Sequence, residues 1–172
     1  GVKKTPLVPV EMHDGPCGVR KPSDSKAKES ANLPASIPAT CFPAPCLVAC
    51  SWDPQIEALF GERIALECLD QKTDIILGPG VNIKRNPLCG RNFEYLSEDP
   101  LLAGKMASGF INGCQALGVG TSLKHFACNN QEFRRMNYSA EVDARALREI
   151  YLKPFEIAVK EANPWTVMCS YN

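Results

Sequence analysis

Residues 99–126 read DPLLAGKMASGFINGCQALGVGTSLKHF, and this stretch decides the fold expected of the chain. Asp99-Pro100 is a helix-start signal, because Asp accepts hydrogen bonds at the N-cap and Pro fits the first helical position. An apolar stripe with helical spacing follows, made of Leu102, Met106, Phe110, Ile111, Cys114 and Leu117. Gly118 suits the left-handed position just after a helix. The apolar run 119–126 then predicts a strand directly behind the helix.

The same alternation of strand and helix continues on both sides of this stretch. Further strand candidates lie at 7–12, 74–77 and 166–170. Asp53-Pro54 begins a second helix, whose predicted apolar face carries Ile56, Leu59, Phe60 and Ile64. Such alternation predicts a parallel sheet whose strands are joined by right-handed helical crossovers.

A third helix is predicted to begin at Asp143, again from an N-cap carboxylate. Its inward-facing residues are predicted to be Leu147, Ile150 and Tyr151. Pro154 lacks a backbone N–H, so it is predicted to break or kink this helix before it resumes over 156–162.

The polar clusters favour an α/β barrel over a doubly wound sheet. Asp14, Arg91, Lys124-His125 and Tyr171 each lie at or after the C-terminal end of a different predicted strand, which is where barrel enzymes place their sites. No G-x-G-x-x-G follows the first strand, which disfavours a dinucleotide-binding fold. Four strands do not close a barrel, so we expect the N-terminal half of a (β/α)8 TIM-type barrel, incomplete over residues 1–172. The start at Gly1 rather than Met also suggests a missing N-terminus.

Composition excludes some classes of partner. The chain has 172 residues, 19 basic and 19 acidic side chains, and 45% hydrophobic residues. A balanced charge argues against a nucleic-acid or membrane-surface partner, because both usually need a basic excess. No apolar run approaches the roughly 20 residues of a membrane span. We therefore expect a globular domain whose partner is neither a nucleic acid nor a membrane.

The nine cysteines favour a reducing compartment. Their odd number and irregular spacing do not match a disulfide framework, and free cysteine behaves as a small apolar residue. No C-x-x-C pair is present, so the cluster Cys41, Cys46 and Cys50 does not match a standard zinc site. These features lead us to expect a cytoplasmic protein with no bound metal.

Two further segments carry expectations. Residues 22–50 are rich in Pro, Ser and Ala, show no period, and are interpreted as a functional loop. Trp52 and Trp165 could serve as platforms for a sugar ring, but both stand beside apolar runs and are therefore predicted to lie in the core.

The run from Lys124 to Arg135, KHFACNNQEFRR, is the strongest functional signal. It places cations, a histidine and several amides in one turn at the end of a strand. A core excludes that many donors because each unpaired polar group costs free energy when buried. A ligand rich in hydroxyl groups would satisfy them, so this run predicts a sugar-type binding site.

Four motifs in order extend this interpretation to a family. They are Asp14 to Lys21 (DGPCGVRK), 78–94 with its segments GPGVNIKR and GRNFE, Lys124 to Phe126 (KHF) with Asn129 to Glu132 (NNQE), and Met168 to Asn172 (MCSYN). Taken together they resemble the N-terminal barrel domain of glycoside hydrolase family 3, of the bacterial β-glucosidase type. The resemblance covers nearly the whole chain, from about Pro9 to the end.

The resemblance implies which side chains contact the sugar. These are Asp14, Arg91, Lys124, His125, Arg135, Met168 and Tyr171. Asp14 would accept from two hydroxyl groups far from the cleaved bond, and the cations and His125 would donate to the others. Met168 and Tyr171 would form the wall near the reacting carbon. In the family the Lys-His peptide can be cis. No cofactor is implied.

Each assignment has a simpler alternative. Asp14 before Gly-Pro could form an Asx turn, and Arg91 with Glu94 could form a structural ion pair. Lys124 could be solvated, and His125 could be a satisfied core residue. The chain also departs from the family pattern, because Cys17 stands where a histidine is frequent. His13 could partly substitute for that histidine. Phe133 is bulkier than usual and could alter the loop that carries Arg135.

The resemblance implies retaining hydrolysis of terminal β-D-glucosyl residues by an intact parent protein. That reaction needs a carboxylate nucleophile and a carboxyl acid/base about 5 Å apart. In the family the nucleophile is an Asp in a Ser-Asp-Trp type motif, which is expected beyond Asn172, so no catalytic residue is assigned here. The expected partners are a β-glucoside or short gluco-oligosaccharide and the missing C-terminal part of the parent chain. β-Xylosidase specificity and a truncated, non-catalytic sugar-binding or vestigial protein remain as alternatives.

Overall fold

The computed structural model describes residues 8–23 and 35–172. Leu7 of the first predicted strand and residues 24–34 of the predicted loop lie outside the described residues. Within the described part, four strands form one sheet in chain order: β1 (Met12–His13), β2 (Ile75–Ile76), β3 (Gly120–Phe126) and β4 (Thr166–Cys169). All neighbouring pairs are parallel, as expected for barrel-type β–α units.

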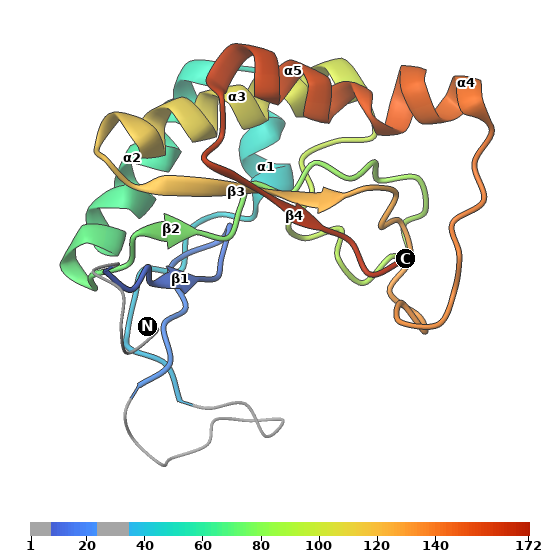
Figure 1. The fold of residues 1–172 in the computed structure, drawn as a ribbon. Coiled ribbons are helices and arrows are strands. Elements are labelled where there is room, and N and C mark those ends of the chain that lie inside the picture. The colour runs from blue at the N-terminus through green and yellow to red at the C-terminus, as the bar shows by residue number, and fades with distance from the viewer. Residues whose placement is uncertain (1–7, 24–34) are drawn as a thin grey trace.

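The helices gather on one face of this sheet. They are α1 (Pro45–Ala49), α2 (Pro54–Asp70), α3 (Pro100–Ala116), α4 (Ala144–Ala146) with the π-helical turn η2 (Leu147–Tyr151), and α5 (Lys153–Ala162). Figure 1 shows α2, α3 and α5 on the same side of the four strands, and α3 packs against both α2 and α5. The α/β prediction of barrel-type units is confirmed. No helix in the described ranges is long and apolar enough to cross a lipid bilayer.

The three predicted N-cap carboxylates begin their helices. Asp53 Oδ1 accepts from the Gln55 amide at 2.8 Å, and Asp99 Oδ1 accepts from the Leu102 amide at 2.7 Å. Asp143 Oδ1 accepts from two amides of the next turn, both at 3.0 Å. Each cap satisfies N–H groups that have no partner within the helix. At the other end of α3, Gly118 adopts a φ of 81°, the left-handed conformation predicted for it.

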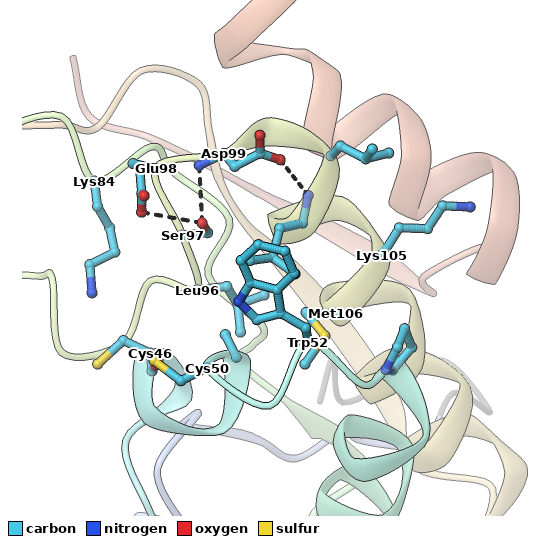
Figure 2. A pocket seen from close by; sticks show the side chains of 14 residues that line it. Cys46, Cys50, Trp52, Lys84, Leu96, Ser97, Glu98, Asp99, Lys105 and Met106 are labelled. Carbon is cyan, nitrogen blue, oxygen red and sulfur yellow. Dashed lines mark hydrogen bonds between the residues drawn. The ribbon is translucent and has the colours of Figure 1, made fainter.

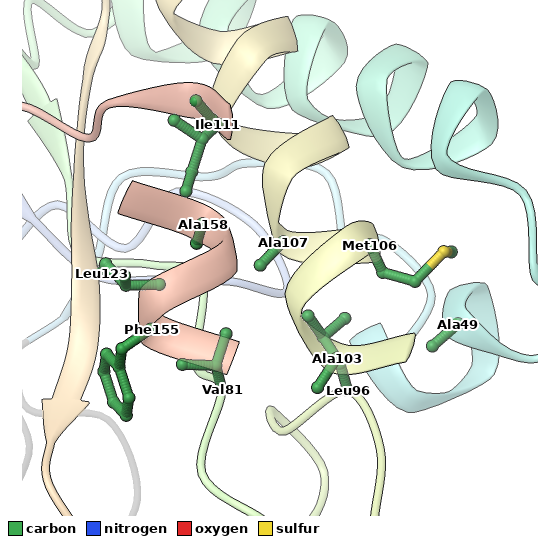
Figure 3. Packing of buried hydrophobic residues seen from close by; sticks show 11 residues of the cluster. Ala49, Val81, Leu96, Ala103, Met106, Ala107, Ile111, Leu123, Phe155 and Ala158 are labelled. Carbon is green, nitrogen blue, oxygen red and sulfur yellow. The ribbon is translucent and has the colours of Figure 1, made fainter. Parts of the chain in front are cut away.

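The apolar core lies between the helices and the sheet. Its largest cluster joins α3 to α5 and β3, with Met106, Ala107, Ile111, Leu123 and Phe155 among its buried members (Figure 3). A second cluster fills the space between α2, α3 and β2, and its aromatic members are Phe60 and Phe110 at 5.7 Å between ring centroids. Both clusters hold the strands in fixed positions, and the loops at the strand ends depend on that support.

The buried stripe of α2 differs from the prediction. Ile56 and Leu59 are exposed, and the buried positions include Glu57, Gly61 and Cys68 beside Phe60 and Ile64. The stripe still has helical spacing, but a carboxylate and a glycine occupy two of its positions. A search for apolar side chains passes over both residues, which explains the error.

Other predicted core residues are also exposed. Trp52 and Trp165 are 76% and 54% exposed to solvent, so the prediction that both lie in the core is wrong. Leu117 and Ile150 are partly exposed as well, because they lie at the end of α3 and in the π-helical turn rather than on the packed face. Proximity to an apolar run in the sequence did not predict burial at these positions.

The helix is interrupted close to Pro154, where the sequence predicted a break or a kink. It is the second residue of α5, where a missing backbone N–H costs nothing. The preceding residues 147–151 form a π-helical turn instead of a regular α-helix. The predicted interruption therefore exists, and it falls just before the proline.

The contact between α2 and α3 depends on small residues. A Cβ atom added to Gly113 would meet the backbone of Ala58, and no flexible side chain there could move aside. We therefore expect Gly113→Ala to lower the free energy of unfolding by about 2 kcal/mol. Urea denaturation would measure this change in the free energy of unfolding, with Asn112→Ala on the exposed side of α3 as the control. Equal stability of both variants would contradict the close approach.

Candidate functional site: a sugar-type pocket at the strand ends

The predicted site residues gather at the C-terminal ends of the strands. Asp14 follows β1, Arg91 lies between β2 and α3, and Lys124-His125 ends β3. Met168 lies in β4 in register with Lys124, and Tyr171 follows that strand. The parallel arrangement brings these residues to one edge of the sheet, as argued from the sequence.

A pocket of about 290 Å³ opens at this edge. Asp14, Arg91 and Lys124 line it, together with Glu94 and Cys17. Its volume is close to the lower end of the range for small-molecule sites. The other predicted residues do not line this pocket.

Lys124 is buried at the base of the pocket between two carboxylates. Its Nζ lies 3.2 Å from Glu94 Oε2 and 3.3 Å from Asp14 Oδ1. Lys124 and Glu94 are only 2% and 3% exposed, whereas Asp14 is 54% exposed. The pocket therefore has a fixed ammonium group at its base and an accessible carboxylate at its mouth. The alternative of a solvated Lys124 is wrong.

Arg91 lies on the side of the pocket and contacts three partners. Its guanidinium donates to Glu94, to Glu132 Oε1 at 3.3 Å and to His125 Nε2 at 2.9 Å. Burial acts to lower the pKa of Arg91, and the neighbouring carboxylates outweigh it, so the net pKa is raised. The structural ion pair with Glu94 exists, and it fixes a guanidinium that also faces the pocket.

His125 is neutral and its tautomer follows from its partners. Arg91 can only donate, so Nε2 accepts, and Nδ1 must carry the proton that it shares with the Tyr95 hydroxyl oxygen at 3.0 Å. Burial, and then the charges of Arg91, Lys124 and Arg135, lower the pKa of His125 to about 3. The ring therefore stays uncharged at neutral pH.

The backbone around His125 is held as firmly as its ring. The Lys124–His125 peptide bond is cis. Asn82 accepts from the His125 amide at 2.9 Å and donates to the His125 carbonyl at 3.0 Å. This pair of hydrogen bonds fixes the direction in which the strand end presents its side chains.

Arg135 and Tyr171 form a separate flank, whereas Met168 is the register partner of Lys124 in the neighbouring strand. Arg135 pairs with Glu132 at 3.2 Å, and its guanidinium lies 5.2 Å from the centroid of the Tyr171 ring. Glu132 also contacts Arg91, so the flank is joined to the pocket through one carboxylate. Met168 is half-buried and Tyr171 is exposed.

Two carboxylates are positioning residues that were not among the predicted sugar contacts. Glu94 contacts Arg91 and Lys124, and Glu132 contacts Arg91 and Arg135. The signal that could have identified them is the number of cations expected at one site, because buried cations need carboxylate partners. The amide of Asn82 had no comparable signal.

His13 does not replace the histidine expected at position 17. Its ring bonds Glu11 at 3.2 Å and is not part of the pocket lining, whereas the Cys17 side chain is. Burial, followed by the charge of Glu94, raises the pKa of the Cys17 thiol to about 11. The pocket wall therefore has a neutral thiol at this position. Phe133 is exposed beside Arg134 and does not contact the pocket.

Across residues 8–23 and 35–172, no three His, Cys, Asp or Glu side chains are placed to hold a metal ion. All nine cysteines are free thiols. The pocket itself offers donation by fixed cations and acceptance by Asp14, which suits a neutral ligand with several hydroxyl groups.

Known proteins of one family resemble this chain. Residues 34–172 match the model of the Glycosyl hydrolase family 3 N terminal domain. An exo-alpha-(1->6)-L-arabinopyranosidase of Bifidobacterium longum is 54% identical over the whole chain, and the thermostable beta-glucosidase B of Acetivibrio thermocellus is 52% identical over 99% of it. The chain spans only 23% and 22% of these two proteins.

Solved structures show the same likeness. Beta-glucosidase 3B of Thermotoga neapolitana, in complex with alpha-D-glucose, superposes with a TM-score of 0.84 at 46% identity, covering 94% of this chain and 22% of that one. The Bifidobacterium adolescentis GH3 beta-glucosidase gives a TM-score of 0.86 at 51% identity, covering all of this chain and 24% of that one. With its fold, ordered motifs and polar strand ends, the chain belongs to glycoside hydrolase family 3, within the N-terminal domain.

Proposed function

We propose that these residues bind the terminal glucosyl ring of a β-D-glucoside for a retaining glycoside hydrolase. The observation that carries the proposal is the buried Lys124, which is held by Glu94, is paired with the accessible Asp14, and lines a small pocket together with it. A fixed donor opposite an accessible acceptor selects a ring by the directions of its hydroxyl groups. Solved relatives in complex with glucose support this choice of ligand.

In this proposal each residue has one task. Asp14 accepts from two hydroxyl groups, and Lys124 and Arg91 donate to others through charge-assisted hydrogen bonds. His125 orients Arg91 through its acceptor Nε2. Because the cations are already paired with carboxylates, they do not need to reorganise when the sugar arrives.

Bond cleavage is proposed to need groups outside these 172 residues. Both oxygens of Glu94 face cations, and Asp14 pairs with Lys124, so neither carboxylate is placed as a nucleophile or as a proton donor. Retaining hydrolysis requires two further carboxyl groups about 5 Å apart. The chain alone is therefore expected to bind sugar with little or no turnover.

Three sugars are considered for the specificity of the site: glucose, xylose and arabinopyranose. The relatives include beta-glucosidases and an arabinopyranosidase at similar identity. We favour glucose because the motif style and the glucose-bound relatives agree. The gene should be sequenced beyond the Asn172 codon, and the resulting protein assayed on aryl β-D-glucoside, aryl β-D-xyloside and aryl α-L-arabinopyranoside. Preference for either pentoside would replace glucose in the proposal. A stop codon after Asn172, with sugar binding retained, would favour a non-catalytic protein.

Substitution of Asp14 tests the binding role directly. Asp14→Asn removes a charged acceptor, and two hydrogen bonds to charge should be lost or weakened, so we expect affinity for glucose to fall about 100-fold. Calorimetric titration of glucose into the chain would measure the change. The control is Asp70→Asn, at the exposed end of α2. Unchanged affinity in Asp14→Asn would exclude Asp14 from the sugar contacts.

A further inference from the structure

We propose that a second cavity, beside Trp52, binds one ring of a neutral saccharide. It has a volume of about 690 Å³ and lies at the start of α3, between α1 and the segment 96–99. None of the seven residues predicted to contact the glucosyl ring lines it. It is therefore a separate site, and it does not depend on the function proposed for the pocket at Asp14.

Trp52 presents its indole ring at this cavity. The residue adopts a φ of 57° in the turn between α1 and α2, and its amide donates to the Ala49 carbonyl at 3.1 Å. This turn directs the side chain away from the core, which leaves it 76% exposed. Figure 2 shows the ring standing over the middle of the cavity. A large aromatic surface held in that position can stack on the apolar face of a ring ligand.

The floor of the cavity is apolar and already packed. Leu96, Met106 and Ala49 line it and are buried members of the main core cluster. A ligand would therefore enter between a rigid floor and the indole ring. A mostly apolar cavity of this size with a few polar groups at its edge is the usual form of a small-molecule site.

The polar groups at the edge identify the chemistry of the ligand. Lys84 and Glu98 line the cavity, and within the described residues neither forms an ion pair. Glu98 instead accepts a hydrogen bond from Ser97 at 3.3 Å. Lys105, in contrast, pairs with Glu161 at 2.6 Å. The edge thus offers one available cationic donor, Lys84, and two carboxylates outside any ion pair among the described residues, Glu98 and Asp99, the second of which also caps α3.

The presence of both an ammonium group and carboxylates at the edge favours a neutral ligand with hydroxyl groups. An anion would be repelled by Glu98, and a cation would be repelled by Lys84. A purely apolar ligand would leave both charged groups desolvated without partners. A sugar ring has one apolar face for Trp52 and hydroxyl edges that both donate and accept, so it satisfies all three groups.

Titration followed by NMR tests the site. The sequence contains two tryptophans, so the ¹⁵N-labelled chain gives two indole N–H signals, which Trp165→Phe assigns. We expect cellotetraose to shift the Trp52 signal saturably, with a Kd on the order of 1 mM. The Trp165 signal should not move, because that ring lies outside the cavity. Linear movement of both signals without saturation, or no movement of Trp52, would overturn the proposal.

Two substitutions test the contacts, and two more serve as controls. Lys84→Met and Glu98→Gln should each weaken binding by about three- to tenfold. The matched control is Lys105→Met, which should change the affinity less than about twofold because that ammonium is already paired. Asp14→Asn should leave the Trp52 response intact. If Asp14→Asn abolished the shift of the Trp52 signal while Lys84→Met and Glu98→Gln did not weaken it, the ligand would occupy the pocket at Asp14. The second site would then be rejected.

Discussion

Glu94→Gln is expected to destabilise the protein by about 3 kcal/mol and to abolish detectable glucose binding. Glu94 is the buried carboxylate that pairs with both Arg91 and Lys124. Without its charge, Lys124 keeps only the half-exposed Asp14, and a buried ammonium with one weak partner costs several kcal/mol. Urea denaturation at pH 7 would give the change in the free energy of unfolding.

A control and a second variant separate charge burial from general damage. Glu149→Gln breaks an exposed pair with Arg145, and it should cost no more than about 0.5 kcal/mol. Adding Lys124→Met to Glu94→Gln removes the unpaired ammonium, so part of the lost stability should return while glucose binding stays absent. If Glu94→Gln were as stable as the Glu149 variant, the buried ion pair would not be holding the site.

Glu57 is expected to make stability fall as pH rises. This residue is 1% exposed in the contact between α2 and α3, and neither carboxyl oxygen has a hydrogen-bond partner in the described structure. Burial raises the pKa of Glu57 from its ordinary value near 4.5 to about 8. Burial raises the pKa of the Cys114 thiol of α3 as well, and the charges of Cys68 and Glu57 add to that rise.

The proton that Glu57 binds in the folded protein sets the direction in which stability changes with pH. Between pH 4.5 and about 8 the folded protein keeps a proton on Glu57 that the unfolded chain has lost. The stabilising contribution is therefore complete below about pH 4.5 and is lost as pH rises through 8, by up to about 1.4 kcal/mol per pH unit. Glu57→Gln should flatten this slope, whereas Glu62→Gln on the exposed face of α2 should not. Parallel pH profiles of the two variants would contradict the assignment.

The sequence predicted the architecture because its signals are local. The carboxylates Asp53, Asp99 and Asp143 each precede a helix, and Gly118 ends one, so these boundaries could be placed without tertiary information. The positions of Asp14, Arg91 and Lys124-His125 after successive strands followed from the same alternation. Parallel strand ends meet at one edge, which is why the candidate site residues could be grouped.

What could not be predicted depends on how the elements meet. Glu57 lies in a buried stripe that apolar periodicity does not detect, and Trp52 is turned outward by one left-handed residue conformation. The division of the site into a pocket and a flank depends on Glu94 and Glu132, whose side chains connect cations far apart in sequence. Pairing of this kind is decided by three-dimensional contacts, and residue spacing alone does not fix it.

Glucose binding at the strand ends tests the central claim most directly. The backbone amide signals of the ¹⁵N-labelled chain would be followed while glucose is added. We predict saturable shifts at Gly15, Glu94 and Lys124, which belong to the pocket lining, and loss of those shifts in Asp14→Asn. If these signals stayed unchanged while glucose shifted signals elsewhere in the chain to saturation, the pocket would not be a glucose site.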